Sequence, residues 1–276
     1  MRAGTTTMIE SMAAFFGIPE FLLLAFLAGS IVAVLSGFFG AFVVQRSLGF
    51  LGNGLAHAAF GGVALGILLD VEPLAVTLPF TLAISSGIVW LRDHSRLGAD
   101  TIIGIFFSVS MALGILLLSQ TPRYTTDAFA YLFGSILSVR PMDLVATSAA
   151  AVVTLACAPL WGRWAYATFD RELAMADKLP AQRDDYLLAG CLAIVIVVAM
   201  KVVGITLIAA FLVIPPAAAR LVARTFAGMT VLSIVLGVAS VFAGLAVAWR
   251  LDWPAGASII LVQSAVFGVA LLLRRD

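Results

Sequence analysis

The sequence predicts an all-α polytopic membrane protein, and three observations lead to this fold class. Of 276 residues, 62% are apolar and only 11% are charged, whereas a soluble domain carries about 25% charged residues. The mean hydropathy is +1.12. Apolar runs recur along the chain, and a helix needs about 20 apolar residues to cross a bilayer. Lipid offers the backbone no hydrogen-bond partners, so these runs are expected to be helices.

Nine apolar runs are candidate spans, so we expect about eight to nine transmembrane helices plus short interfacial helices. They cover residues 21–44, 55–69, 73–91, 101–120, 142–162, 186–200, 204–219, 227–249 and 255–273. The first run is too long for a cleavable signal peptide and follows an N-terminal extension, residues 1–20. Two runs, 55–69 and 186–200, are short. Phe129–Val139 is too short to cross, and we expect it to form an interfacial or re-entrant helix.

The basic residues in the short loops predict the orientation. With the loop 45–54 placed inside, the inside holds Arg46, Arg92, Arg96, Arg163, Arg171, Lys178, Arg183, Arg220, Arg224, Arg274 and Arg275, and the outside holds Arg2, Arg123, Arg140, Lys201 and Arg250. The excess of eleven basic residues inside over five outside predicts that the N-terminus lies outside and the C-terminus inside. Residues 1–276 then form a single transmembrane domain.

Charge and motifs exclude several function classes. A net charge of +1 does not suit a nucleic-acid binder that works by bulk positive charge. The chain has no GxxxxGK[ST] phosphate loop, so it cannot power uphill work with ATP by that motif. Cys157 and Cys191 lie in apolar runs without zinc-site spacing and are interpreted as small buried side chains.

Asn53 and His57 form the most informative polar pair. They lie four residues apart, so on a helix they share one face. An ionisable residue inside an apolar run suggests function, and neutral imidazole is a common ligand for zinc and similar metals. The alternative is a histidine that simply hydrogen-bonds a neighbouring helix. One histidine cannot complete a tetrahedral site, although a two-fold dimer could supply two copies of the pair.

A stripe of small residues lies on the same helix as this pair. Gly54, Ala58, Gly62 and Gly66 recur every four residues. Small side chains allow a second helix to approach closely in a membrane. We therefore expect a tight helix–helix seam beside Asn53 and His57.

Two inner-face segments, 163–185 and 215–226, are candidate coupling regions. Pro215-Pro216 is expected to break its helix and to start a short basic amphipathic helix with Arg220 and Arg224. Arg171 and Glu172 belong to a second short helix that ends before Pro180. Each segment is either a membrane-anchored turn or a docking element for a cytoplasmic partner.

The remaining polar residues carry weaker hypotheses. His94 is expected to be a solvated inner-loop residue, and Lys201 is expected to reach the outer interface. Asp70 and Glu72 form an acidic pair at the outer end of a helix. Asp127 and Asp252 are outer-loop acids for which the sequence shows no partner.

Eight short motifs, weak singly but specific together, run in order along nearly the whole chain. They are Gly40–Arg46 (GAFVVQR), Gly52–Ala58 (GNGLAHA), Leu68–Pro73 (LLDVEP), Asp100–Gly104 (DTIIG), Ala130–Gly134 (AYLFG), Val198–Gly204 (VAMKVVG), Leu212–Arg220 (LVIPPAAAR) and Asp252–Ile260 (DWPAGASII). With them the chain resembles permease subunits of bacterial ABC importers for divalent transition metals, most closely those for high-affinity zinc uptake.

The resemblance implies a homodimer in the bacterial inner membrane. Two copies of a cytoplasmic ATPase would drive it, and an extracytoplasmic metal-binding protein would supply Zn²⁺ as substrate, with no permanently bound cofactor. The family's Asp-x-x-x-His metal pair falls on Asn53 and His57, and a neutral amide is a poorer zinc ligand than the usual carboxylate. The family's coupling segment falls on Pro215–Arg224.

Three other functions are alternatives to zinc import. An importer for manganese, iron or a metal chelate has the same general features. An intramembrane protease would need a nucleophile–base pair or two acids at membrane depth, and the sequence contains neither GxSG nor HExxH. An ion-driven secondary transporter typically shows internal repeats and intramembrane acids, which are not evident in this chain.

Overall fold

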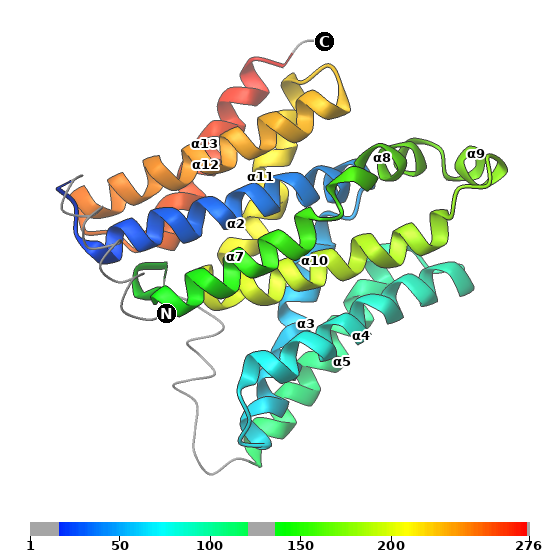
Figure 1. Cartoon of the computed structure of the whole chain (residues 1–276), viewed down its shortest axis with the longest axis horizontal. Coiled ribbons are helices and arrows are strands. Elements are labelled where there is room, and N and C mark those ends of the chain that lie inside the picture. The colour runs from blue at the N-terminus through cyan, green and yellow to red at the C-terminus, as the bar shows by residue number, and fades with distance from the viewer. Residues whose placement is uncertain (1–16, 121–135, 275–276) are drawn as a thin grey trace.

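The computed structural model describes residues 17–120 and 136–274, which fold into helices joined by short loops (Figure 1). Nine membrane-spanning candidates lie within this part of the chain, as predicted. Eight are single helices: α2 (Glu20–Gln45), α3 (Gly49–Leu68), α4 (Pro73–His94), α5 (Ala99–Ser119), α10 (Ala181–Val203), α11 (Ile205–Val222), α12 (Phe226–Leu251) and α13 (Ala255–Leu272). The ninth joins α7 (Pro141–Leu155), a 3-10 turn and α8 (Trp161–Phe169). Helix α9 (Arg171–Ala176) is short.

The two runs that the sequence marked as short belong to longer helices. The run 55–69 lies in α3, which begins at Gly49, and the run 186–200 lies in α10, which extends from Ala181 to Val203. The residues of α3 before its apolar run include three glycines and Asn53, and those of α10 before its run include Gln182, Arg183, Asp184 and Asp185. None of these residues interrupts the backbone hydrogen bonds of a helix. The boundaries of these two apolar runs therefore do not coincide with the first residues of α3 and α10.

Helix α2 lies at the centre of the bundle. It contacts α12, α11, α7 and α10, and four consecutive residues, Leu22 to Ala25, are all buried, so the helix is covered on every side there. A helix that is apolar all round suits such a position. Helices α3, α4 and α5 form a group that leans away from the main bundle in Figure 1 and joins it through α10 and α11.

The two ends of the bundle differ in their charged contacts. Helices α8 and α9 project at one end, here called the α9 end (Figure 1). At the opposite end, the ammonium group of Lys201 lies 3.2 Å from a carboxylate oxygen of Asp143 and 3.7 Å from one of Glu72. Glu72 precedes α4, Asp143 lies in the first turn of α7, and Lys201 lies in the last turn of α10. They meet at one end of the bundle because successive helices run in opposite directions.

Helix α11 corrects the prediction for Pro215 and Pro216. The expected break is wrong, because α11 continues through both prolines to Val222 and no separate helix forms between there and α12. Both proline side chains are buried. Neighbouring helices can cover the carbonyl groups that proline leaves unbonded in a membrane helix. Gly40 of α2 packs against this part of α11 and provides that cover.

Some predictions fall on residues outside the described ranges. They include most of the N-terminal extension 1–20, most of the expected interfacial helix Phe129–Val139, and Asp127. Of the interfacial segment, Ile136–Ser138 is described as a 3-10 turn.

Candidate functional site

Asn53 and His57 lie on one face of α3, one turn apart, and both are half-buried. The His57 ring stands edge-on to Phe107 of α5, with ring centroids 5.4 Å apart. Its Nδ1 atom is buried and has no hydrogen-bond partner among the described residues. Phe50, one turn before Asn53, is exposed. The pair therefore lines a surface of this chain, with an imidazole nitrogen not used by the described fold.

The face of α3 next to this pair is closely packed. A Cβ atom on Gly54 would collide with the side chain of Ile103 of α5. A Cβ on Gly62 would lie 2.8 Å from the Cα of Thr77, and one on Gly66 would lie 2.8 Å from the Cα of Pro73, both in α4. Ala58 is also buried. The small residues thus place α3 in direct contact with α4 and α5, which fixes the direction in which Asn53 and His57 face.

A single copy of the chain offers few metal ligands. Within residues 17–120 and 136–274, no group of three or more His, Cys, Asp or Glu side chains is placed to hold a metal ion. Zinc sites in proteins are usually four-coordinate. The Asn53–His57 face can supply two ligands, so a complete site needs further groups from another source.

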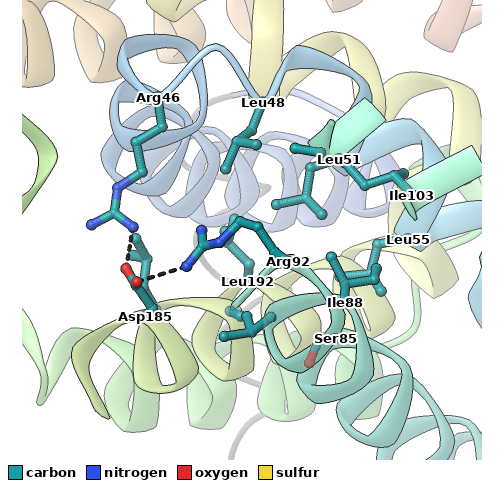
Figure 2. Close-up of a pocket in the computed structure, with 14 residues that line it drawn as sticks. Arg46, Leu48, Leu51, Leu55, Ser85, Ile88, Arg92, Ile103, Asp185 and Leu192 are labelled. Carbon is teal, nitrogen blue, oxygen red and sulfur yellow. Dashed lines mark hydrogen bonds and ion pairs between the residues drawn. The ribbon is translucent and has the colours of Figure 1, made fainter. Parts of the chain in front are cut away.

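A cluster of ion pairs surrounds the buried Asp185 at the α9 end, and Figure 2 shows its contacts with Arg46 and Arg92. Asp185, near the start of α10, is 4% exposed. One of its carboxylate oxygens lies 2.5 Å from the guanidinium of Arg46 at the C-terminal end of α2. The other lies 2.7 Å from Arg92 of α4 and 3.2 Å from Arg171 of α9. One carboxylate therefore joins four helices.

Further contacts extend this group, which we call the Asp185 cluster: Arg46, Arg92, Asp93, Arg171 and Asp185. Arg171 lies 3.2 Å from both carboxylate oxygens of Asp93. Arg46 also donates a hydrogen bond to the hydroxyl of Thr168 in α8, at 2.9 Å. Buried charges are costly unless they are paired and hydrogen-bonded, and here each carboxylate has more than one cationic partner.

Asp184 makes a separate, more local ion pair. Its side chain is fully buried and accepts two hydrogen bonds from Arg163 of α8, at 2.7 and 2.6 Å. This pair joins α10 to α8 alone.

Sequence reasoning missed both aspartates. They lie in the segment 163–185, and their arginine partners entered the prediction only as inner-face basic residues, with Arg171 also placed in a candidate coupling helix. One signal was present: adjacent acids directly before an apolar run, with arginines at the ends of other runs.

A small cavity of about 40 Å³ lies beside the Asp185 cluster. Arg46, Arg92 and Asp185 cover one end, and apolar side chains that include Leu51 and Ile88 line the rest (Figure 2). A water molecule needs about 10–15 Å³, so the cavity has room for a few waters. Its apolar lining and its arginines do not suit a divalent cation.

Some of the residues predicted to couple the chain to a cytoplasmic partner are exposed, and others are buried. Glu172, Leu173 and Met175 of α9 are exposed, and Asp170 caps the helix by accepting a hydrogen bond from the Leu173 amide at 2.8 Å. Arg220 and Arg224 are also exposed, and Arg220 donates to the carbonyl oxygen of Val44 at 3.1 Å. Pro215 and Pro216 are buried in α11, so they offer no docking surface.

Residues 19–274 match the model of the ABC 3 transport family. The chain belongs to this family. It is 30% identical over 256 residues to the high-affinity zinc uptake system membrane protein ZnuB of Haemophilus influenzae, covering 92% of this chain and 98% of that protein. It is 33% identical over 255 residues to the manganese import system permease protein ScaB of Streptococcus gordonii, covering 92% and 91%. The solved PsaBC complex from Streptococcus pneumoniae contains a chain with 31% identity and a TM-score of 0.82, with 95% of both chains covered.

This ABC permease is therefore a metal-transporter subunit and a multi-pass membrane protein. It is not an enzyme, because ATP hydrolysis belongs to a separate subunit of such transporters. Its relatives are named for zinc and for manganese, so family membership leaves the choice of metal to the chemistry of the site.

Proposed function

We propose that this ABC permease passes Zn²⁺ across the membrane as a homodimer. Two copies of a cytoplasmic ATPase drive it, and an extracytoplasmic binding protein delivers the metal. One observation carries the proposal: His57 is half-buried on the Asn53 face of α3, and its Nδ1 has no hydrogen-bond partner among the described residues. Neutral imidazole is a preferred zinc ligand.

A second copy supplies what one chain lacks. The seam with α4 and α5 fixes one side of α3, and the half-buried Asn53 and His57 lie beside it, with the His57 ring against Phe107 of α5. A two-fold axis next to this face places two imidazoles and two amides around one ion. Isologous contacts of this kind are the commonest symmetry in oligomers.

Asn53 makes this a weak and neutral site. Two carboxylates at this position would give the dimer two negative charges, whereas two amides give none. A transport site must release its ion as well as bind it. A weak site suits passage of the metal better than storage.

Manganese is the second candidate. An amide oxygen is a harder ligand than imidazole and suits Mn²⁺, and the similarity to the manganese permease ScaB, at 33% identity, is as high as that to the zinc permease ZnuB. Imidazole, however, is the stronger donor in the pair, and it favours zinc.

The ATPase is proposed to dock at the α9 end, which faces the cytoplasm in the orientation that the basic loop residues favour. Helix α9 projects there, with exposed Leu173 and Met175 next to charged Glu172. Arg220 and Arg224 supply exposed positive charge at the end of α11. An apolar centre with a charged border is typical of a protein interface.

Metal uptake by the complete transporter tests the proposal. The permease, its ATPase and its binding protein are reconstituted in liposomes, and uptake of labelled zinc and labelled manganese is measured with ATP inside. Zinc uptake that depends on ATP and on His57 supports the proposal. Faster uptake of manganese under the same conditions would assign the second candidate instead.

A further inference from the structure

We propose that Asp185 is a positioning residue that couples movement of α9 to α4, and through α4 to the helix that carries His57. The proposal rests on the proposed docking of the ATPase at the α9 end. A displacement of α9 would reach the face of α3 that carries Asn53 and His57 through the contact between α4 and α3.

Helix α9 has little apolar attachment to the bundle. Its buried residue is Ala174, which packs with Ala167 of α8 and Ala181 at the start of α10. Ion pairs made by Arg171 join α9 to α4 through Asp93 and to α10 through Asp185. Arg171 is therefore the side chain through which α9 contacts both α4 and α10.

The two oxygens of Asp185 divide their partners between helices. One binds Arg46 of α2, and the other binds Arg92 of α4 together with Arg171 of α9. Because α4 and α9 share the same oxygen, a displacement of Arg171 changes the position that Arg92 can hold. The low exposure of Asp185, 4%, limits the access of water to this shared oxygen, whereas Arg171 itself is 42% exposed.

From α4 the contact continues to α3 at backbone level. Gly62 and Gly66 lie directly against Thr77 and Pro73, with no intervening side chain that could absorb a shift. Closely packed interiors transmit displacement. Asn53 and His57 lie on this same helix α3, so movement of α4 reorients the proposed metal-binding face.

Asp184 offers a matched control. It is adjacent to Asp185 and at least as buried, and it also pairs with an arginine, but its partner Arg163 belongs to α8 alone. Replacing Asp184 removes a buried carboxylate from the same turn of α10 while leaving the contacts among α9, α4 and α2 in place.

The experiment compares Asp185→Asn with Asp184→Asn in the complete reconstituted transporter. The measured quantity is metal transported per ATP hydrolysed. We expect Asp185→Asn to lower this ratio about tenfold, the order seen for changes along coupled networks, while ATP hydrolysis continues. Asp184→Asn is expected to keep the wild-type ratio. Equal ratios for the two variants would overturn the proposal.

Arg171→Gln provides a second variant if Asp185→Asn does not assemble. Arg171 is 42% exposed, so its replacement disturbs the fold less and cuts only the link to α9. The same loss of coupling is expected. A wild-type ratio for Arg171→Gln would show that α9 does not act through the cluster.

A distance measurement separates this proposal from the proposed function. Spin labels on exposed Ala176 at the end of α9 and exposed Trp90 of α4, in a background with both native cysteines replaced by alanine, report whether the two helices move together. We expect one narrow distance distribution in the wild-type complex, with and without ATP, and a broad one in Asp185→Asn. An unchanged distribution would contradict the role of Asp185 even if the wild-type complex transported no metal.

Discussion

Gly40 of α2 lies directly against the carbonyl oxygen of Leu212 in α11. A Cβ atom on Gly40 would be 2.6 Å from that oxygen and 2.8 Å from the ring of Pro216. Proline has no amide hydrogen, so Pro216 cannot donate to Leu212 as an ordinary helical residue would. The backbone of α2 thus covers the carbonyl that Pro216 leaves without its helical partner, which favours continuation of α11 at this position.

Replacing Gly40 with alanine should destabilise the permease. The added methyl group would have to push α2 away from the backbone of α11, and overpacking of this kind costs about 1–3 kcal/mol. Thermal unfolding of the purified protein measures the effect. Gly268→Ala in α13 is the control, because a Cβ there meets no atom within 4 Å; equal stability of the two variants would contradict the account of α11.

Replacing Gly62 with leucine should abolish uptake or assembly. A Cβ at Gly62 already lies 2.8 Å from the backbone of Thr77, so a larger side chain must separate α3 from α4. Metal uptake and the amount of assembled complex are both measured, with Gly268→Leu as the control. Normal uptake by Gly62→Leu would show that the seam does not position the metal-binding face.

Replacing His57 with alanine should lower zinc uptake strongly at unchanged protein level. Loss of a residue that hydrogen-bonds a metal ligand already lowers metal affinity or activity about tenfold. The loss of a ligand should lower zinc uptake by at least as much. Asn53→Asp should be tolerated, because a carboxylate is the better metal ligand, and tighter metal binding is expected. Uptake of labelled zinc is compared at equal expression. Normal transport by His57→Ala would make it a structural histidine and place the metal pathway elsewhere.

Reversing the charges of Arg220 and Arg224 to glutamate should abolish transport-coupled ATP hydrolysis. Both residues are exposed at the end of α11, so the dimer should still fold, while a docked ATPase would meet repulsion instead of attraction. Hydrolysis by the complete transporter is measured with and without binding protein and metal. Arg250→Glu, an exposed charge at the opposite end of the bundle, serves as the control, and wild-type stimulation in the double variant would exclude this surface.

Replacing Leu173 with aspartate should release the ATPase from the permease. Leu173 is 48% exposed on α9, so the change adds charge to the proposed interface without disturbing a buried contact. Co-purification of the ATPase with the tagged permease measures the result. Leu69→Asp is an equivalent change at the opposite end, where the side chain is 57% exposed, and it should retain the ATPase. Retention by both variants would place the docking surface away from α9.

The sequence alone determined the fold class, because lipid permits few backbone structures. Apolar runs of spanning length must be helices, and each of the predicted spans corresponds to a span in the described chain. The sequence also placed Asn53 and His57 on one face and the small residues beside them, since a helical repeat fixes which residues share a face.

Tertiary structure decided what no local pattern could. Asp185 and Arg46 lie 139 positions apart in the chain, so only the packing of α10 against α2 and α4 turns these charges into a buried cluster. The same holds for Pro215 and Pro216: proline locally favours a break, but Gly40 on a distant helix covers the unbonded carbonyl and the helix continues. Local sequence sets the preference of each segment, and contacts between distant segments determine whether that preference is realised.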